Sequence, residues 1–226
     1  NNINNYFPIN TSKNTMKINY LEALENPSLR QNYLDYLVES SELKFPYVNE
    51  FRYITNEEAG KIKDRLCRSN EKELEKITAI CSPNGEIQTN STIYFTENNF
   101  SDNCERLIHH AVVSQNDFET AQRLELCYHE AVHSEHFGKG IDGFNLEEFK
   151  IETEEGKRLF LIASELDAHT KHIKELGNTK ANSFYLREYQ KFLIGMFKSY
   201  MTLLPNLVQQ GFTKDYLEKF LRDIKS

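Results

Sequence analysis

The sequence lacks an excess of positive charge and a long apolar run, and each absence excludes a class of protein. Lysine and arginine total 27 against 34 acidic residues, a net charge of -7, and no basic block stands out, so we expect no nucleic-acid partner. No run of 18 or more uncharged apolar residues occurs, because even the stretch FLIGMFKSYMTLL is interrupted by Lys198. We therefore expect no insertion into a membrane.

The sequence also lacks paired cysteines and a leader segment. Its four cysteines are widely spaced and form no CxxC pair, which argues against a cysteine-rich structural zinc site and favours reduced thiols in a cytosolic setting. The start, NNINNYFPINTSKNT, has neither an initiator methionine nor a basic-then-apolar leader. We expect a processed form or a piece of a longer protein; cytosolic, translocated and secreted locations stay open, as does the oligomeric state.

The length of 226 residues suffices for one domain with a core, so we expect a single domain over 16–226 after an asparagine-rich tail or linker over 1–15. Apolar periodicity, caps and turns predict a mostly helical (α+β) domain with a small sheet before its central helices. Strands are expected at 48–54 and on both sides of a hairpin turn over 82–85. Helices are expected as two pieces broken at Pro27, at 55–69, at 103–113, from Asn116 to an end at Gly138, from Thr153 to Gly177, at 182–204 and at 214–225.

The stretch HEAVH, residues 129–133, carries the strongest chemical signal in the chain. Positions i and i+4 of a helix share a face, so His129 and His133 can offer two imidazole nitrogens to one ion, with Glu130 beside them. A hydrolytic zinc site needs two such ligands and a carboxylate that takes a proton from a metal-activated water and delivers it to a leaving amine. The motif predicts one zinc ion per chain, bound by both histidines, with Glu130 as the general base.

A chance match of three letters is the competing interpretation, and the residues around the motif argue against it. Apolar residues fall at every angle of this helix rather than on one stripe, which predicts a largely buried helix. They are Leu124, Leu126, Cys127, Tyr128, Ala131, Val132 and Phe137. Buried histidine and glutamate side chains need partners, and a metal ion would satisfy both imidazoles.

A catalytic zinc site normally has three protein ligands, so a third must come from elsewhere in the chain. A histidine six residues past His133 is excluded as this ligand, because that position holds Lys139. In the next helix, SELDAH places Glu165 and His169 on one face. We prefer Glu165 as the third ligand, since it lies nearer the middle of the apolar run LFLIA.

The face that bears Glu165 and His169 continues through Ile162 and Ile173, so two ionisable groups sit in an apolar stripe and need a partner on the neighbouring helix. We expect Asp167 and His169 to orient the imidazoles or the glutamate. The alternative is that Glu165 and His169 form an i,i+4 pair in solvent at the rim of the stripe.

HEAVH followed by SELDAH resembles the motifs of the gluzincin metallopeptidases, whose zinc is held by both histidines of HExxH and by a glutamate on a later helix. Glu165 to Ala168 is similar to the first part of their ExxAD motif, and His169 departs from it where aspartate is expected. The two motifs lie 32 residues apart (165 minus 133) and cover none of the remaining chain. The resemblance therefore supports a clan and no particular family.

The resemblance implies a zincin-like metallopeptidase domain, with His129, His133 and Glu165 as zinc ligands and Glu130 as general base. It also implies that the sheet ahead of the motif helix has an edge strand along which an extended peptide binds. The candidate residues for this substrate-binding strand are Thr92, Ile93, Tyr94 and Phe95.

Peptide hydrolysis also needs a donor for the oxyanion that forms when water attacks the carbonyl. His172, Tyr185, Tyr189 and His136 are candidates, and the sequence does not choose among them. The competing interpretation of His136 is a partly exposed residue that interacts with the helix C-terminus.

The favoured function is a zinc-dependent peptidase, in first place an endopeptidase, that hydrolyses a protein or peptide substrate. A bacterial effector or toxin would suit the small acidic domain. One rival is a helical di-metal protein, which needs a second ExxH, and the position three after Glu165 holds Ala168 instead. The other rival is a non-enzymatic interaction domain with structural metal or none, in which the aromatic residues of the last helices would contact a partner.

Overall fold

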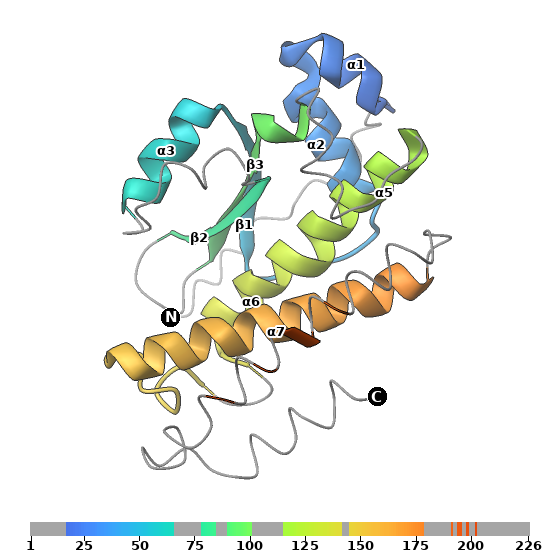
Figure 1. Ribbon diagram of the computed structural model, residues 1–226. Helices are drawn as coiled ribbons and strands as arrows, with labels where there is room; N and C mark the ends of the chain where they lie inside the picture. The colour runs from blue at the N-terminus through green and yellow to red at the C-terminus, as the bar shows by residue number, and fades with distance from the viewer. Residues whose placement is uncertain are drawn as a thin grey trace, which may run out of the picture.

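The computed structural model describes residues 17–65, 78–84, 90–100, 115–141 and 145–178, together with five separate helical positions at Lys191, Ile194, Gly195, Lys198 and Thr202 (Figure 1). Within these residues the protein combines helices with one small sheet, which confirms the predicted mixture of helix and strand. The predicted tail and the helices predicted at 103–113 and 214–225 lie outside the described residues. None of the described helices is long and apolar enough to span a membrane.

Two helical pieces separated at a proline open the described chain, as predicted. Helix α1 covers Tyr20–Glu25, a 3-10 turn η1 covers Pro27–Leu29, and α2 covers Arg30–Glu39. The Asn19 side chain accepts a hydrogen bond from the Glu22 N–H, and the Glu22 carboxylate accepts one from the Asn19 N–H. This reciprocal cap fixes the start of α1.

The sheet has three strands in the order β1-β3-β2, where β1 is Val48–Ile54, β2 is Ala79–Pro83 and β3 is Ser91–Thr96. Strands β2 and β3 are antiparallel neighbours, which confirms the hairpin. The predicted turn over 82–85 is displaced, because Ser82 and Pro83 still pair with β3, and residues 85–89 lie outside the described part. Strand β1 adds to the other side of β3 in parallel.

The prediction that residues 92–95 form an edge strand is wrong. These residues lie in β3, whose backbone is paired with β1 on one side and with β2 on the other. The backbone of these residues is therefore already paired on both sides and cannot bind an extended peptide as an added strand. In the described sheet the edges belong to β1 and β2.

Two short elements connect the sheet to the helices. Helix α3, Asn56–Arg65, follows β1 and begins with the predicted capping box, in which the Thr55 hydroxyl accepts from the Glu58 N–H and the Glu58 carboxylate accepts from the Thr55 N–H. The 3-10 turn η2, Glu97–Phe100, follows β3 and is largely buried.

The helix that carries HEAVH is not uniform. It consists of α5, Gln115–Leu124, a π-helical turn η5, Glu125–Glu130, and α6, Ala131–Lys139. In the π turn the Ala131 N–H bonds to the Leu126 carbonyl, five residues back. Such turns bulge the helix and change which side chains share a face, and they are frequent at functional sites.

The predicted end of this helix at Gly138 is wrong by two residues. The C-cap is Gly140, with φ 88°, a backbone conformation that glycine adopts without strain. Gly138 lies within α6 beside the Tyr47 ring, which occupies the space where a Cβ would stand. Gly138 therefore allows close packing between α6 and the segment before β1.

The core lies where the π turn packs onto α2 and the sheet. Its buried side chains include Tyr33, Leu37, Phe95, Leu126 and Cys127. Of the apolar residues around the motif, Leu124, Leu126, Cys127 and Ala131 are buried and Tyr128, Val132 and Phe137 are half-buried, which confirms that this helix is largely buried.

The second central helix, α7, covers Glu154–Asn178 and begins with the predicted Thr153, whose hydroxyl accepts from the Gly156 N–H at 3.0 Å. In Figure 1 α7 runs as one long helix beneath the sheet and beside α6. It packs on both α6 and the π turn, so the two sequence motifs face each other.

Replacement of Gly156 by alanine should destabilise the protein, because the new Cβ would overlap the backbone carbonyl oxygens of Phe149 and Lys150. Overpacking of this kind costs about 1–3 kcal/mol, and about 2–4 °C of the unfolding midpoint follows each kcal/mol in a chain of this size. Gly177→Ala on the same helix is the control, since nothing lies within 4 Å of its Cβ position and alanine favours helix. Equal midpoints for the two variants in thermal unfolding would contradict the prediction.

Candidate metal centre

Three potential ligands from three adjacent elements converge on one point. His129 comes from the π turn, His133 from α6 and Glu165 from α7. The two imidazole Nε2 atoms are 3.2 Å apart, and they lie 3.6 Å (His129) and 3.4 Å (His133) from the two carboxylate oxygens of Glu165. These are the three residues that the sequence predicted as ligands, and together they could hold a metal ion.

The group is closed on the histidine side and open at the glutamate. His129 and His133 are buried, whereas 38% of the Glu165 side chain is exposed. A catalytic metal site needs an open position of this kind, and a purely structural one does not.

Charge and burial leave the group in the protonation state that a cation requires. Burial and the nearby histidines hold the pKa of His133 well below its ordinary value of 6.5, although Glu165 acts in the opposite direction. Burial raises the pKa of Glu165, but the hydrogen bond from His169 and the charges of the histidines outweigh it and hold that pKa well below its usual range. At neutral pH the group thus offers a neutral His133 imidazole and an ionised carboxylate.

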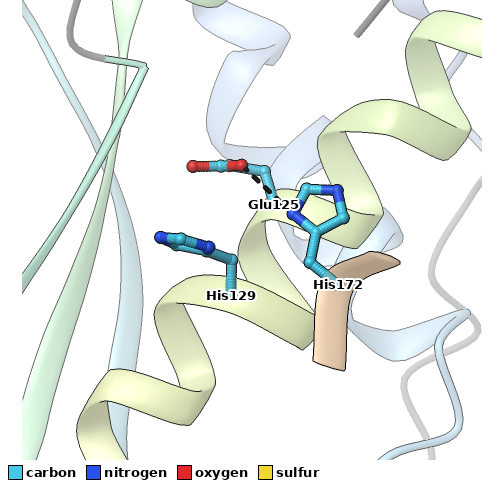
Figure 2. A group of neighbouring side chains, drawn as sticks. All are labelled: Glu125, His129 and His172. Carbon is cyan, nitrogen blue, oxygen red and sulfur yellow. Dashed lines mark ion pairs between the residues drawn. The ribbon is translucent and has the colours of Figure 1, made fainter. Parts of the chain in front are cut away.

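His129 also belongs to a second group, with Glu125 and His172 (Figure 2). Glu125 stands one π turn before His129, and His172 reaches across from α7, where its Nδ1 lies 3.7 Å from the Glu125 carboxylate. In Figure 2 a dashed line joins Glu125 to His172, and the His129 ring lies below the Glu125 carboxylate. This second group can hold a cation too, or its members can orient the His129 ring, and both possibilities need His129.

Glu130 lies apart from both groups, on the side of the helix that faces the sheet. It is only 7% exposed, and its charge contributes to raising the pKa of the Cys81 thiol on β2, behind the larger effect of burial. Neither of the two ligand groups found among the described residues includes it. Glu130 therefore follows a potential ligand directly in the sequence and lies near β2.

The residues expected to orient the ligands separate into two roles. His169 Nε2 lies 3.4 Å from the Glu165 carboxylate, and the His169 and His129 ring centroids are 4.4 Å apart. His169 therefore contacts two of the three potential ligands directly. The predicted i,i+4 pair of Glu165 and His169 therefore exists and at the same time faces the motif histidines. Asp167 is 2.7 Å from His136 Nε2, so it reaches the ligands only through other residues.

Ser164 is the residue that sequence reasoning missed. Its Oγ lies between the Nδ1 atoms of His133 and His136, 2.7 Å and 2.8 Å away. Only its position directly before Glu165 could have drawn attention to it, because a buried serine in an apolar helix has no signature of its own.

The structure gives different surroundings to the two histidines predicted as oxyanion donors. His136 is buried rather than partly exposed, and both of its ring nitrogens have partners, Ser164 and Asp167, which leaves it no donor for a substrate. His172 is fully buried against Glu125, which favours a role beside His129. Tyr185 and Tyr189 lie outside the described residues.

The predicted apolar stripe of the second helix is displaced. Ile162 and Ile173 are half-buried, and the buried apolar positions of α7 are spread around much of the helix rather than gathered on that stripe. They are Leu159, Phe160, Ala163, Leu166, Ala168 and Leu176. Glu165 therefore stands at the rim of the core rather than in the middle of it, which accounts for its exposure.

Comparisons with models of protein families, with curated proteins and with solved structures found no match to this chain. The arguments for a function therefore come from the site itself.

Glu165→Gln and Glu125→Gln form a matched pair that tells which group holds the metal. The purified protein should carry about one metal ion per chain by elemental analysis after dialysis, and Glu165→Gln should lose most of it, because an amide is a poor replacement for an anionic ligand. Glu125→Gln should keep it. The opposite pattern would move the metal to the group of Glu125, His129 and His172.

The pH dependence of stability follows from the low pKa of His133. With the metal removed by chelation, the unfolded chain binds a proton at this residue as the pH falls below about 6.5, whereas the folded chain does not. The unfolding midpoint should therefore fall from pH 7 to pH 5. In His133→Gln this part of the slope should vanish, and an unchanged slope would show that His133 does not contribute to it.

Proposed function

We propose that the protein is a zinc-dependent peptidase that hydrolyses peptide bonds in an extended protein or peptide substrate. The observation that carries the proposal is the convergence of His129, His133 and Glu165 at one partly open point. Glu130 follows His129 directly in the sequence and is not part of the ligand group. The resemblance of HEAVH and SELDAH to the gluzincin motifs points in the same direction. A zincin-like arrangement of the domain is part of the same proposal.

The separations between the ligand atoms support zinc in particular. Zinc with bonds of about 2.0–2.1 Å to tetrahedral ligands places neighbouring donor atoms about 3.3 Å apart. The distances of 3.2, 3.4 and 3.6 Å between the nitrogens and carboxylate oxygens are close to this value. Two imidazoles with one carboxylate form a familiar catalytic ligand set for zinc.

The residues of the chain have distinct tasks in this reaction. When bound, zinc would make a water molecule more acidic and polarise the carbonyl of the scissile bond. Glu130 would take a proton from the attacking water and pass it to the nitrogen of the leaving amine as the carbon–nitrogen bond breaks. Burial of Glu130 at 7% exposure limits competition from bulk water for that proton.

The substrate-binding strand is reassigned to β2. This strand is at an edge of the described sheet, packs against the π turn and α6, and carries Cys81 near Glu130. A peptide that added to β2 by backbone hydrogen bonds would run close to the proposed general base Glu130. Backbone pairing also fits an endopeptidase, because it needs no free terminus.

Glu130→Gln is the direct test of the reaction. The variant should lose about 10²-fold or more of the hydrolysis rate, because the amide cannot accept the proton, while its metal content and unfolding midpoint stay unchanged. Glu135→Gln is the matched control, since Glu135 lies on α6 and pairs with Lys139 on the surface. Cleavage is measured on a library of peptides prepared by digesting a proteome. Mass spectrometry then identifies and counts the new peptide termini that appear after incubation with each protein.

The outcomes separate the possibilities. Cleavage by the wild type and by Glu135→Gln, with none by Glu130→Gln, supports the peptidase. Equal cleavage by all three would exclude Glu130 as the base. A protein that binds zinc and cleaves no peptide of the library would favour an interaction domain with a structural metal.

A further inference from the structure

A chain of short hydrogen bonds leads away from the metal centre on the side of His133. Ser164 Oγ lies 2.7 Å from His133 Nδ1 and 2.8 Å from His136 Nδ1. His136 Nε2 lies 2.7 Å from Asp167 Oδ2, which also accepts from Lys171 Nζ at 2.7 Å. Ser164 and His136 are buried, so water does not compete for these bonds.

Asp167, at the end of the hydrogen-bond chain away from the metal centre, determines which atom donates in each hydrogen bond. Asp167 Oδ2 lies 2.7 Å from the Lys171 ammonium nitrogen and 2.7 Å from His136 Nε2, so an ammonium group and an imidazole converge on one carboxylate oxygen. An ionised carboxylate only accepts hydrogen bonds, so His136 Nε2 carries a hydrogen and donates it. In a neutral ring, His136 Nδ1 is then an acceptor.

The remaining two bonds follow from this assignment. Among the described residues, the partners of the Ser164 hydroxyl are the Nδ1 atoms of His133 and His136. Because His136 Nδ1 is an acceptor, the hydroxyl donates its hydrogen to that atom. Its oxygen then accepts from His133 Nδ1, which must carry a hydrogen. The lone pair of His133 is thereby on Nε2, the atom that lies 3.2 Å from His129 Nε2 and 3.4 Å from Glu165.

We propose that Ser164 and His136 are positioning residues that hold His133 in the tautomer and orientation in which Nε2 can bind a metal ion, with Asp167 setting the direction of the chain. Metal-binding histidines commonly donate their other ring hydrogen to a carboxylate or carbonyl, which fixes the tautomer. Here that role is transmitted from a carboxylate through an imidazole and a hydroxyl. The inference rests on the proposed metal site and deepens it.

The first test is the zinc affinity of the full chain, measured by competition with a chromophoric chelator. Ser164→Ala should bind zinc about 10–100-fold more weakly, the usual effect of removing the partner of a metal-binding histidine. Ser134→Ala is the matched control, because Ser134 is also buried but its hydroxyl donates only to the Ala131 carbonyl of its own helix. Ser164→Thr, which keeps the hydroxyl, should recover most of the affinity.

The second test needs no variant and reads the tautomers directly. Nitrogen-15 NMR of the histidines in the zinc-loaded protein should find a hydrogen on Nδ1 of His133, and on Nε2 but not on Nδ1 of His136. A purely structural role for Ser164 makes no such prediction. If His136 carries hydrogens on both nitrogens or on Nδ1 alone, the proposed chain is overturned, even where Ser164→Ala fails to fold.

The results distinguish this inference from the proposed function. Zinc binding by the wild type with unchanged affinity in Ser164→Ala would overturn the role of Ser164 and leave the peptidase proposal intact. Absence of zinc binding in the wild type would overturn both. Weaker binding in Ser164→Ala alone, together with the expected tautomers, supports the inference.

Discussion

The structure depends on one constraint: a row of imidazoles and carboxylates lies between two helices, and its buried members need partners. From Glu125 to His136 on one helix the contacts meet α7 in reverse order, from His172 back to Ser164, so the helices run antiparallel. Ionisable groups removed from water are costly unless they are paired or hydrogen-bonded. The packing of the two helices, the geometry of the centre and its protonation states are therefore parts of one arrangement, and a cation at its middle would take the place of the hydrogen bond between the two Nε2 atoms.

The π turn carries both apolar residues of the core and polar residues that face α7. Leu126 and Cys127 in the turn pack into the core formed with α2 and the sheet, while Glu125 and His129 in the same turn face α7. A bulge in the helix is one way to supply both faces within six residues, at the cost of less regular hydrogen bonding. The same stretch therefore contributes both to the core and to the candidate metal groups. A change that disrupts the core at this turn should also disturb the geometry of those groups.

Local signals were sufficient to predict much of the fold and the residues of one group that could hold a metal ion, but not the contacts between distant segments. The capping box at Thr55 and Glu58, the hairpin and the i,i+4 spacing of His129 and His133 depend on residues a few positions apart, and they were predicted correctly. The edge-strand prediction failed because β1 inserts beside β3 from a distant part of the sequence, and a strand does not encode how many neighbours it has. The role of Ser164 depends on the angle at which α7 crosses α6, which no spacing within either helix specifies.

The uneven exposure of His129, His133 and Glu165 bears on the kind of metal site that they could form. A structural site would be expected to close around its ion on all sides, whereas here Glu165 stands at the rim of the core with 38% of its side chain exposed. The buried side, in contrast, is held by the hydrogen bonds of His133 through Ser164 to His136, all between 2.7 and 2.8 Å. Rigid support behind one ligand and solvent access beside another is the arrangement that hydrolysis needs, because the geometry must persist while substrate and water exchange. Glu130 is buried near the edge strand β2 rather than at the exposed rim, and in the proposed reaction it would be the proton acceptor on the side of that strand.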